Sequence, residues 1–369
     1  MKRKRFAEFF AGAGLVRLGL EGAGWTCLFA NDIDPKKAAV YSMNFNGARF
    51  MVEDIHHVRP EDVPDVELAT ASFPCTDLSL AGQRRGLAGK ESGSFYGFAR
   101  LLEKMGRRRP PMVLLENVPG LLTSRGGLDI EQTLATLGAM GYLVDMFTVD
   151  ARWFTPQSRL RLFILGRKTT VKKRKRRGTG FFDERDERLK PGSLIRAVSS
   201  NPGASWGFVE IPSPLPQTAL RLEDIVEQDA RARWWDEERV RALVAQMSER
   251  SRRRLEAAVA APVKQYAAAF KRVRDGSVRV EPRFDGIAGC LRPPRGGSSR
   301  QILMMMGRGR LKARHMTARE YGRLQGAGDG FRVPPRQSDG MFAFGDAVCA
   351  PAIRWIAQAI INPLVDDGR

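Results

Sequence analysis

VELATASFPC, residues 66–75, is an apolar, strand-like run that ends in a proline and a cysteine, and a polar stretch dotted with glycines follows it. In an open α/β sheet, ligands bind at the carboxyl ends of the strands. Cys75 therefore lies where such a fold keeps its chemistry. Taken alone, a structural role is the commoner one, because free cysteine prefers burial. Cys27, Cys290 and Cys349 lie in apolar or small-residue surroundings that suit buried structural thiols.

Other apolar runs alternate with helical patterns on both sides of this segment. They lie near residues 5–10, 26–30, 111–116, 143–149 and 160–165. This alternation of strand and helix patterns predicts an α/β fold, with a mostly parallel sheet and helices on both faces. From about residue 168 to 310, charge runs, prolines and a helical segment at 234–251 replace it, which we interpret as a separate, irregular and basic module. Helices are expected again near 317–325 and 351–361.

Composition narrows the class of protein. With 369 residues and 43% hydrophobic content, the chain can bury a large core and is expected to form two domains, or one with a big insertion. No apolar run approaches membrane-spanning length, so we expect a soluble, cytoplasmic protein without a membrane partner. Four cysteines without a Cys-x-x-Cys pair, and three scattered histidines, predict no metal site.

Positive charge is the strongest compositional signal. The formal net charge is +20, and basic residues cluster at 107–109, 172–177, 252–254 and 292–314. Clustered Lys and Arg favour a polyanionic partner, because phosphate contacts release condensed counterions. The alternative is a basic proteome in which surface charge serves only solvation.

Two segments suggest a nucleoside-type ligand. Residues 8–14, EFFAGAG, form a strand that turns through glycines, and Asp32 ends the next strand at the distance where such folds bind a ribose. Arg17 replaces the third glycine of the dinucleotide fingerprint, which favours S-adenosylmethionine over a pyrophosphate. Asp54 and Ile55 could contact an adenine. The alternatives are a structural turn and an exposed loop acid.

Two further segments carry charge into apolar surroundings. Glu116 ends the apolar strand 112–115, where a carboxyl group is costly to bury without a task or a partner. Residues 157–161, QSRLR, would place Arg159 and Arg161 on one face of a strand. The alternative for the second pattern is an edge strand with charges turned to water.

Taken in order, these motifs resemble those of the DNA cytosine-5 methyltransferases of bacterial or phage type. The resemblance covers nearly all of the chain outside the basic module. It rests on the glycine turn, Asp32, Asp54, Phe73-Pro74-Cys75, Glu116-Asn117-Val118, residues 157–161, residues 317–326 and Phe344-Gly345-Asp346-Ala347-Val348. Each motif alone is weak or moderate, whereas their joint order is specific.

The resemblance implies a Rossmann-like, S-adenosylmethionine-dependent fold and a covalent mechanism. Cys75 would add to carbon 6 of a flipped-out cytosine, Glu116 would act at N3, and Arg161 would hold the carbonyl oxygen with support from Arg159. The stretch 76–90 resembles the family's mobile loop, with DNA contacts from Ser79, Gln83, Arg84 and Arg85.

The same resemblance implies the contacts to S-adenosylmethionine. Phe10, Ile33 and Ile55 would flank the adenine, Asp32 would bind the ribose and Asp54 the adenine amine. The remaining expected contacts are Gly12, Gly14, Pro74, Phe95, Asp346 and Val348. Two positions depart from the family pattern, because Leu15 replaces a usual glycine and Asp346 replaces a common asparagine.

The basic module would be the target-recognition domain. We expect it at residues 168–311, with residues 1–167 and 312–369 forming a discontinuous catalytic domain. Expected contacts to double-stranded DNA are Lys172, Lys173, Arg174, Arg295, Ser298 and Arg300. A solvated charge run and a flexible hinge are the alternatives for these two stretches. We expect a monomer, with a cognate restriction endonuclease as a candidate partner.

Two rival functions stay open. An RNA cytosine-5 methyltransferase could use the same fold, although the tRNA-modifying relatives resemble a chain with a smaller insertion. A DNA-binding protein without activity could also keep the fold, but it would be expected to have lost Cys75, Glu116 or Arg161. Methyl incorporation into duplex DNA and into tRNA would separate these functions.

Overall fold

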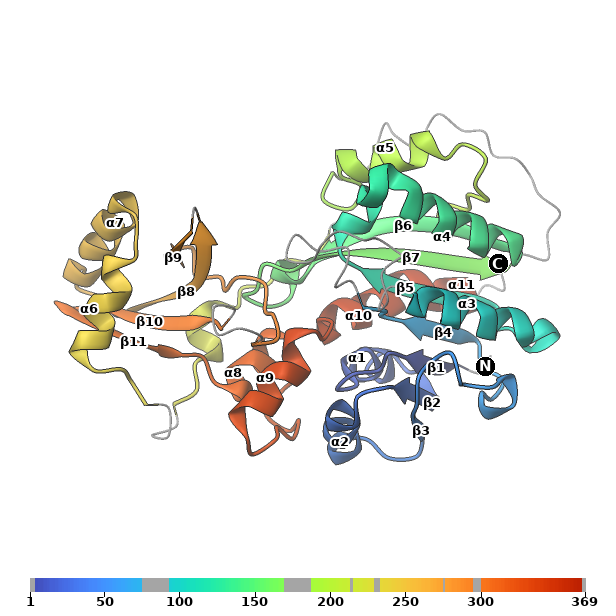
Figure 1. Cartoon of the computed structure of the whole chain (residues 1–369), viewed down its shortest axis with the longest axis horizontal. Coiled ribbons are helices and arrows are strands. Elements are labelled where there is room, and N and C mark those ends of the chain that lie inside the picture. Colours follow the sequence, from blue (N-terminus) through green and yellow to red (C-terminus); the bar gives the residue numbers. More distant parts are fainter. Residues whose placement is uncertain are drawn as a thin grey trace.

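The computed structural model describes residues 4–74, 93–168, 187–212, 215–228, 233–274, 276–294 and 300–366. Two lobes are visible in Figure 1, each built on its own sheet. The larger lobe carries seven strands and the smaller one carries four. Both chain ends lie in the larger lobe, so the chain enters the smaller lobe and returns (Figure 1).

The larger sheet has the order β3-β2-β1-β4-β5-β7-β6. Its five strands from β3 to β5 are parallel, and β7 runs antiparallel to both of its neighbours. The mostly parallel sheet predicted from the sequence is thereby confirmed. Only the short β3 was missed. The strands are β1 (Arg5–Phe9), β2 (Thr26–Asp32), β3 (Arg49–Val52), β4 (Leu68–Ala71), β5 (Met112–Asn117), β6 (Tyr142–Asp150) and β7 (Leu160–Lys168).

Helices cover both faces of this sheet, because its strands are apolar on both sides. In β5, Val113 and Leu115 join one core, whereas Met112 and Leu114 join the other. The first core is closed by α3 (Ser94–Lys104), α4 (Leu128–Ala139) and α5 (Gly192–Ser200). The second is closed by α1 (Leu15–Glu21), α10 (Ala350–Ile356) and the π-helical turn Ala357–Ile361. The remaining helices of this lobe are α2 (Pro35–Asn44) and α11 (Asn362–Asp366).

The smaller lobe contains a regular antiparallel sheet in the order β11-β10-β8-β9. Its strands are β8 (Gln265–Arg274), β9 (Ser277–Arg283), β10 (Ile302–Gly307) and β11 (Arg310–His315). The expectation of an irregular module was therefore wrong for this part. Alanine, methionine and arginine fill strands where the sequence rules look for β-branched residues, so the pattern gave no strand signal.

Two helix pairs enclose the smaller sheet. On one face lie α6 (Glu237–Ala245) and α7 (Glu249–Ala260), which share a core with Ala267, Ile302 and Met304. On the other face lie α8 (Ala318–Leu324) and α9 (Gln337–Gly345), beside Ala268 and Leu303. The helical segment expected at 234–251 thus consists of two helices.

The packing of the described residues suggests other domain boundaries than the expected ones at residues 168 and 311. The division into two domains itself stays a prediction. Helix α5 belongs to the core of the larger sheet, and β11 continues the smaller sheet as far as His315. Leu215 packs in the larger lobe, whereas Leu222 packs beneath the smaller sheet. We therefore propose to move the boundaries to the stretch between Leu215 and Leu222 and to the residue after His315.

The expectation about apolar runs needs one correction. The segment Gln337–Asp366 is long and apolar enough to cross a membrane by length and composition. The core helices of soluble proteins pass the same test, and more than half of its apolar stretch is buried. A break between α9 and α10 interrupts it, so the segment is not one continuous helix, and its parts pack in the core of the protein.

Candidate active site

The carboxyl ends of the parallel strands bring the sequence motifs together. β1 ends at Phe9, β2 at Asp32 and β5 at Asn117, and all three ends lie on one edge of the sheet because these strands are parallel. The order reverses between β1 and β4, which is the switch point where such sheets bind ligands. The side-chain amide of Asn117 donates to the carbonyl of Phe73 at 3.4 Å, so the segment leading to Cys75 leaves from the same edge.

The turn after β1 contains a strained residue, Phe10, and a glycine, Gly12, that leaves room for a ligand. Phe10 has φ of 57°, in the left-handed region that non-glycine residues rarely adopt. A Cβ at Gly14 would lie 2.4 Å from the ring of Phe45, whereas a Cβ at Gly12 would meet nothing within 4 Å. The N–H of Gly12 donates to Asp32 Oδ2 at 2.8 Å, which ties the turn to the end of β2.

The residues around this turn fit an adenosyl group. Ile33 is 64% exposed although it is a large apolar side chain, so it offers a bare surface beside the turn. Ile55 is buried, and Asp54 accepts from the N–H of His56 at 2.9 Å. An apolar platform flanked by carboxylates suits an aromatic base with its amine and its ribose hydroxyls.

Phe95 and Val348, two other expected contacts, lie inside the protein. Phe95 is fully buried against the ring of Phe73, and Val348 packs in the second core of the larger sheet. In this structure both are core residues that pack behind the strand ends. Pro74, the last described residue before Cys75, is exposed.

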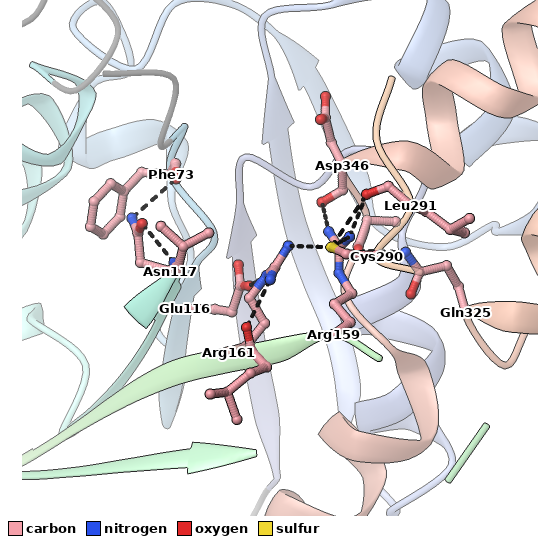
Figure 2. Close-up of polar contacts among 12 residues, drawn as sticks. Phe73, Glu116, Asn117, Arg159, Arg161, Cys290, Leu291, Gln325 and Asp346 are labelled. Atoms are coloured by element: carbon pink, nitrogen blue, oxygen red, sulfur yellow. Dashed lines mark hydrogen bonds and ion pairs between the residues drawn. The ribbon is translucent and has the colours of Figure 1, made fainter. Parts of the chain in front are cut away.

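Glu116 forms an ion pair with Arg161 (Figure 2). The distance from Glu116 Oε1 to Arg161 Nε is 2.9 Å, and both side chains are largely buried. Burial raises the pKa of the Glu116 carboxyl, and this outweighs the opposing charges of Arg161 and Arg159 and the hydroxyl of Ser72. Ser72 lies directly after β4, so the carboxyl faces the strand end that leads to Cys75.

Arg159 is buried and joins three parts of the chain. Its Nη1 donates to the carbonyl of Leu291 at 2.9 Å, and its Nη2 donates to that of Asp346 at 3.2 Å. Its backbone N–H donates to Asp150. Burial and the nearby charge of Arg161 lower the pKa of this guanidinium. Arg159 therefore fixes the β7 end against the segment that returns from the smaller lobe.

Cys290 lies between the two arginines, which corrects the expectation of an apolar, structural thiol. Its sulfur accepts from Arg159 Nη1 at 3.3 Å and from Arg161 Nη2 at 3.8 Å (Figure 2). Burial acts to raise the pKa of this thiol, but Arg159 and Arg161 more than offset that, so its pKa lies below the usual value. The flanking sequence shows only the smaller contribution of Arg292, because Arg159 and Arg161 come from a distant part of the chain.

Asp346 forms an ion pair with Lys37, which lies outside the sequence motifs. Its Oδ2 lies 3.2 Å from Lys37 Nζ, at the start of α2. Burial acts to lower the pKa of Lys37, but Asp346 and Asp32 raise it above its ordinary value. The negative charge of Asp346, one of the two expected departures from the motif pattern, is thereby balanced. Leu15, the other departure, is a buried core residue.

Two buried glutamines hold the frame of the site. Gln157 donates to the carbonyl of Leu324 at 2.8 Å and accepts from the N–H of Leu291 at 3.2 Å. Gln325 donates to the carbonyl of Phe344 at 2.8 Å. Together they tie the β7 end to α8 and α9. Both residues occur in the sequence motifs, but only the structure shows what they connect.

The family model for C-5 cytosine-specific DNA methylases matches residues 4–362, nearly the whole chain. The chain belongs to the C-5 cytosine-specific DNA methylase family. The DNA methylase family members it resembles include Type II methyltransferase M2.BsuMI of Bacillus subtilis (strain 168), 37% identical over 44% of this chain and 41% of that protein. Type II methyltransferase M.Bsp6I of Bacillus sp. (strain RFL6) is 33% identical over 44% of this chain and 51% of its own. The matches thus span about half or less of these relatives.

Solved structures agree on the fold. A methyltransferase of Entamoeba histolytica, EhMeth, superposes with a TM-score of 0.65 at 14% identity, over 100% of both chains. The S. pombe Dnmt2 methyltransferase gives a TM-score of 0.61 at 18% identity, over 98% of this chain and 99% of its own. The sheet described above is therefore the methyltransferase fold.

Several residues expected from the DNA methylase resemblance lie outside the described residues. They are Cys75, Ser79, Gln83, Arg84, Arg85, Lys172, Lys173, Arg174, Arg295 and Ser298. Arg300 is described and lies in the smaller lobe, two residues before the start of β10. Within the described ranges, no group of three or more His, Cys, Asp or Glu could hold a metal ion.

Proposed function

We propose that this protein is a DNA cytosine-5 methyltransferase that modifies a cytosine in duplex DNA. The observation that carries the proposal is the buried Glu116–Arg161 pair at the sheet edge from which the Cys75 segment leaves. A carboxyl group of raised pKa beside a fixed guanidinium suits a ring that gains charge during the reaction. The family match over residues 4–362 supports the same chemistry.

Each residue would have a separate task. The thiolate of Cys75 would add to carbon 6 of the cytosine, which makes carbon 5 nucleophilic. Protonated Glu116 would donate to N3, and Arg161 would donate to the carbonyl oxygen. Carbon 5 would then accept the methyl group, a base would remove its proton, and the thiolate would leave. The target is stacked inside a duplex, so it would have to be flipped out.

S-adenosylmethionine would supply the methyl group as an electrophile. Ile33 and Ile55 would hold the adenine between them, Asp54 would accept from its amine, and Asp32 would accept from the ribose. Gly12 leaves open space beside the turn, where a side chain would stand in the way. Lys37, held between Asp32 and Asp346, is a further cation at this edge.

Duplex DNA would be the partner, and the net charge of +20 supports this. The similar proteins named above include Type II methyltransferases, so a cognate restriction endonuclease is a further proposed partner. We also propose that the protein acts in the cytoplasm, where its DNA would be, and that it acts as a monomer.

Methyl incorporation tests the proposal directly. Labelled S-adenosylmethionine should mark carbon 5 of cytosine in unmethylated duplex DNA and should leave total tRNA unlabelled. Glu116→Gln should reduce the turnover number by about 100-fold or more, because general acid catalysis is typically of that size, while cofactor affinity stays within about twofold. Labelling of tRNA alone, or normal turnover by Glu116→Gln, would refute the proposal.

A further inference from the structure

A cavity of about 260 Å³ lies in the smaller lobe, away from the site described above. Its lining includes Trp235, Arg239, Lys271 and His315, which come from the start of α6, from β8 and from β11. The lobe that these elements form is separated from the larger sheet in Figure 1. No part of the proposed catalytic machinery lines this cavity.

The walls of the cavity are held in place by packing. The backbone N–H of Trp235 donates to the carbonyl of Ala313 on β11 at 2.9 Å. The Arg239 guanidinium lies 4.1 Å from the centre of the Trp235 ring, and the His315 ring meets that ring edge-on at 5.0 Å. An arginine stacked in this way keeps its N–H groups free to bind a ligand at its edge.

The cavity has an excess of positive charge. No carboxylate lines it, and no described acid forms an ion pair with Arg239 or Lys271. Arg241, on the same helix, pairs instead with Glu237. Burial, together with the charges of Arg300, Arg239 and Lys271, lowers the pKa of His315 to about 4, so this histidine is neutral at pH 7.

Two buried nitrogen atoms, one in the lining residue His315 and one in Arg300, whose charge acts on His315, have no hydrogen-bond partner in the described part of the chain. His315 Nδ1 and Arg300 Nε are buried, and neither has a hydrogen-bond partner among the described residues. Buried polar atoms are rarely left unpaired. Within the described ranges, the Arg300 Nε–H lacks an acceptor, and His315 lacks one in the tautomer that carries its proton on Nδ1. Because the Trp235 ring is already covered by Arg239 and His315, the cavity offers donors rather than a surface for stacking a base.

We propose that this cavity binds a backbone phosphate of duplex DNA. Arg239 and Lys271 would supply the charge, and neutral His315 would add a hydrogen bond. The inference rests on the proposed function for its choice of DNA as the source of the phosphate. A phosphate contact positions the duplex without reading its sequence, so the effect should be the same for every sequence.

Salt-dependent binding of labelled duplexes, followed by fluorescence anisotropy, tests this. Arg239→Ala and Lys271→Ala should each lower the slope of log K against log [NaCl] by about one. Each should also weaken binding roughly fivefold or more at low salt, equally for two unrelated sequences. Arg241→Ala on the same helix is the matched control and should change neither quantity. Arg239→Lys should keep the slope, which separates lost charge from lost packing.

Three outcomes would overturn the inference. These are wild-type protein that does not bind duplex DNA, variants that match Arg241→Ala, and a loss confined to one sequence. The two proposals can also fail separately. If the variants show the expected slope changes but the wild-type protein transfers no methyl group, the proposed function is refuted and the phosphate site is supported.

Discussion

At the centre of the site, one thiol touches two guanidinium groups. Cys290 lies 3.3 Å from Arg159 and 3.8 Å from Arg161, and Arg161 in turn holds Glu116. The thiol reaches this place on the segment that returns from the smaller lobe. It can therefore position Arg161, the residue we propose for the cytosine carbonyl, without touching the base itself.

Alkylation should reveal the environment of this thiol. At pH 7, iodoacetamide should modify Cys290 before Cys27 and Cys349, because burial raises the pKa of Cys27 to about 12 and that of Cys349 to about 11. Mass spectrometry of tryptic peptides after timed exposure measures the order. Modification of Cys27 first would contradict the lowered pKa of Cys290.

The positioning role makes a kinetic prediction. Cys290→Ala removes an acceptor from Arg161 and should reduce kcat/KM by about tenfold, as expected for one hydrogen bond to a charged group. Cys290→Ser keeps an acceptor and should recover most of that loss. If both variants behave alike, Cys290 serves only as packing.

At the scale of elements, the turn between β1 and α1 contains one glycine that the packing requires and another that we assign to the cofactor edge. Gly12 and Gly14 both have positive φ, of 56° and 81°. Only at Gly14 would a Cβ also collide with the rings of Tyr41 and Phe45. The two glycines form a matched pair in one turn.

Alanine substitution should therefore give different results at the two positions. Gly14→Ala should lower the free energy of unfolding by about 2 to 4 kcal/mol, from backbone strain plus overpacking. Gly12→Ala should cost about 1 to 2 kcal/mol and should weaken S-adenosylmethionine binding more strongly. Urea denaturation and calorimetric titration measure the two effects. Equal destabilisation with unchanged binding would argue against the proposed cofactor edge.

The elements also show what the sequence can predict. The strands of the larger sheet other than β3 were predictable because apolar runs end at recognisable residues such as Asp32 and Glu116. The second sheet was not, because Ala267 and Met304 carry no clear strand preference. The contacts of Cys290 and Lys37 depend on chain segments that meet only after folding, so no local pattern reports them.

At the scale of the whole molecule, one buried acid makes stability depend on pH. Glu8 in β1 is 1% exposed, and its Oε2 has no hydrogen-bond partner within the described chain. Burial raises its pKa from 4.5 to about 8, despite the N–H of Arg17. Between these pH values the folded protein keeps a proton that the unfolded chain has lost. Its contribution to stability therefore falls as pH rises through this window.

Glu8→Gln should remove this dependence. Between pH 5 and pH 8.5, wild-type protein should lose about 2 to 4 kcal/mol more of its unfolding free energy than the variant does. Urea denaturation at both pH values measures the difference, and every other titrating group acts equally in both proteins. Parallel losses would mean that Glu8 titrates normally.

At the same scale, we propose that the two lobes have different tasks. The chemistry would take place at the edge of the larger sheet, and a DNA phosphate would bind in the smaller lobe. The proposed chemistry depends on a covalent step at Cys75, whereas phosphate binding does not. The most direct test is a duplex that carries 5-fluorocytosine at the target position, incubated with S-adenosylmethionine. Fluorine at carbon 5 cannot be removed as a proton, so wild-type protein should stay bound as a denaturation-resistant complex, whereas Cys75→Ser should form none. Equal trapping by both proteins, or by neither, would contradict the account.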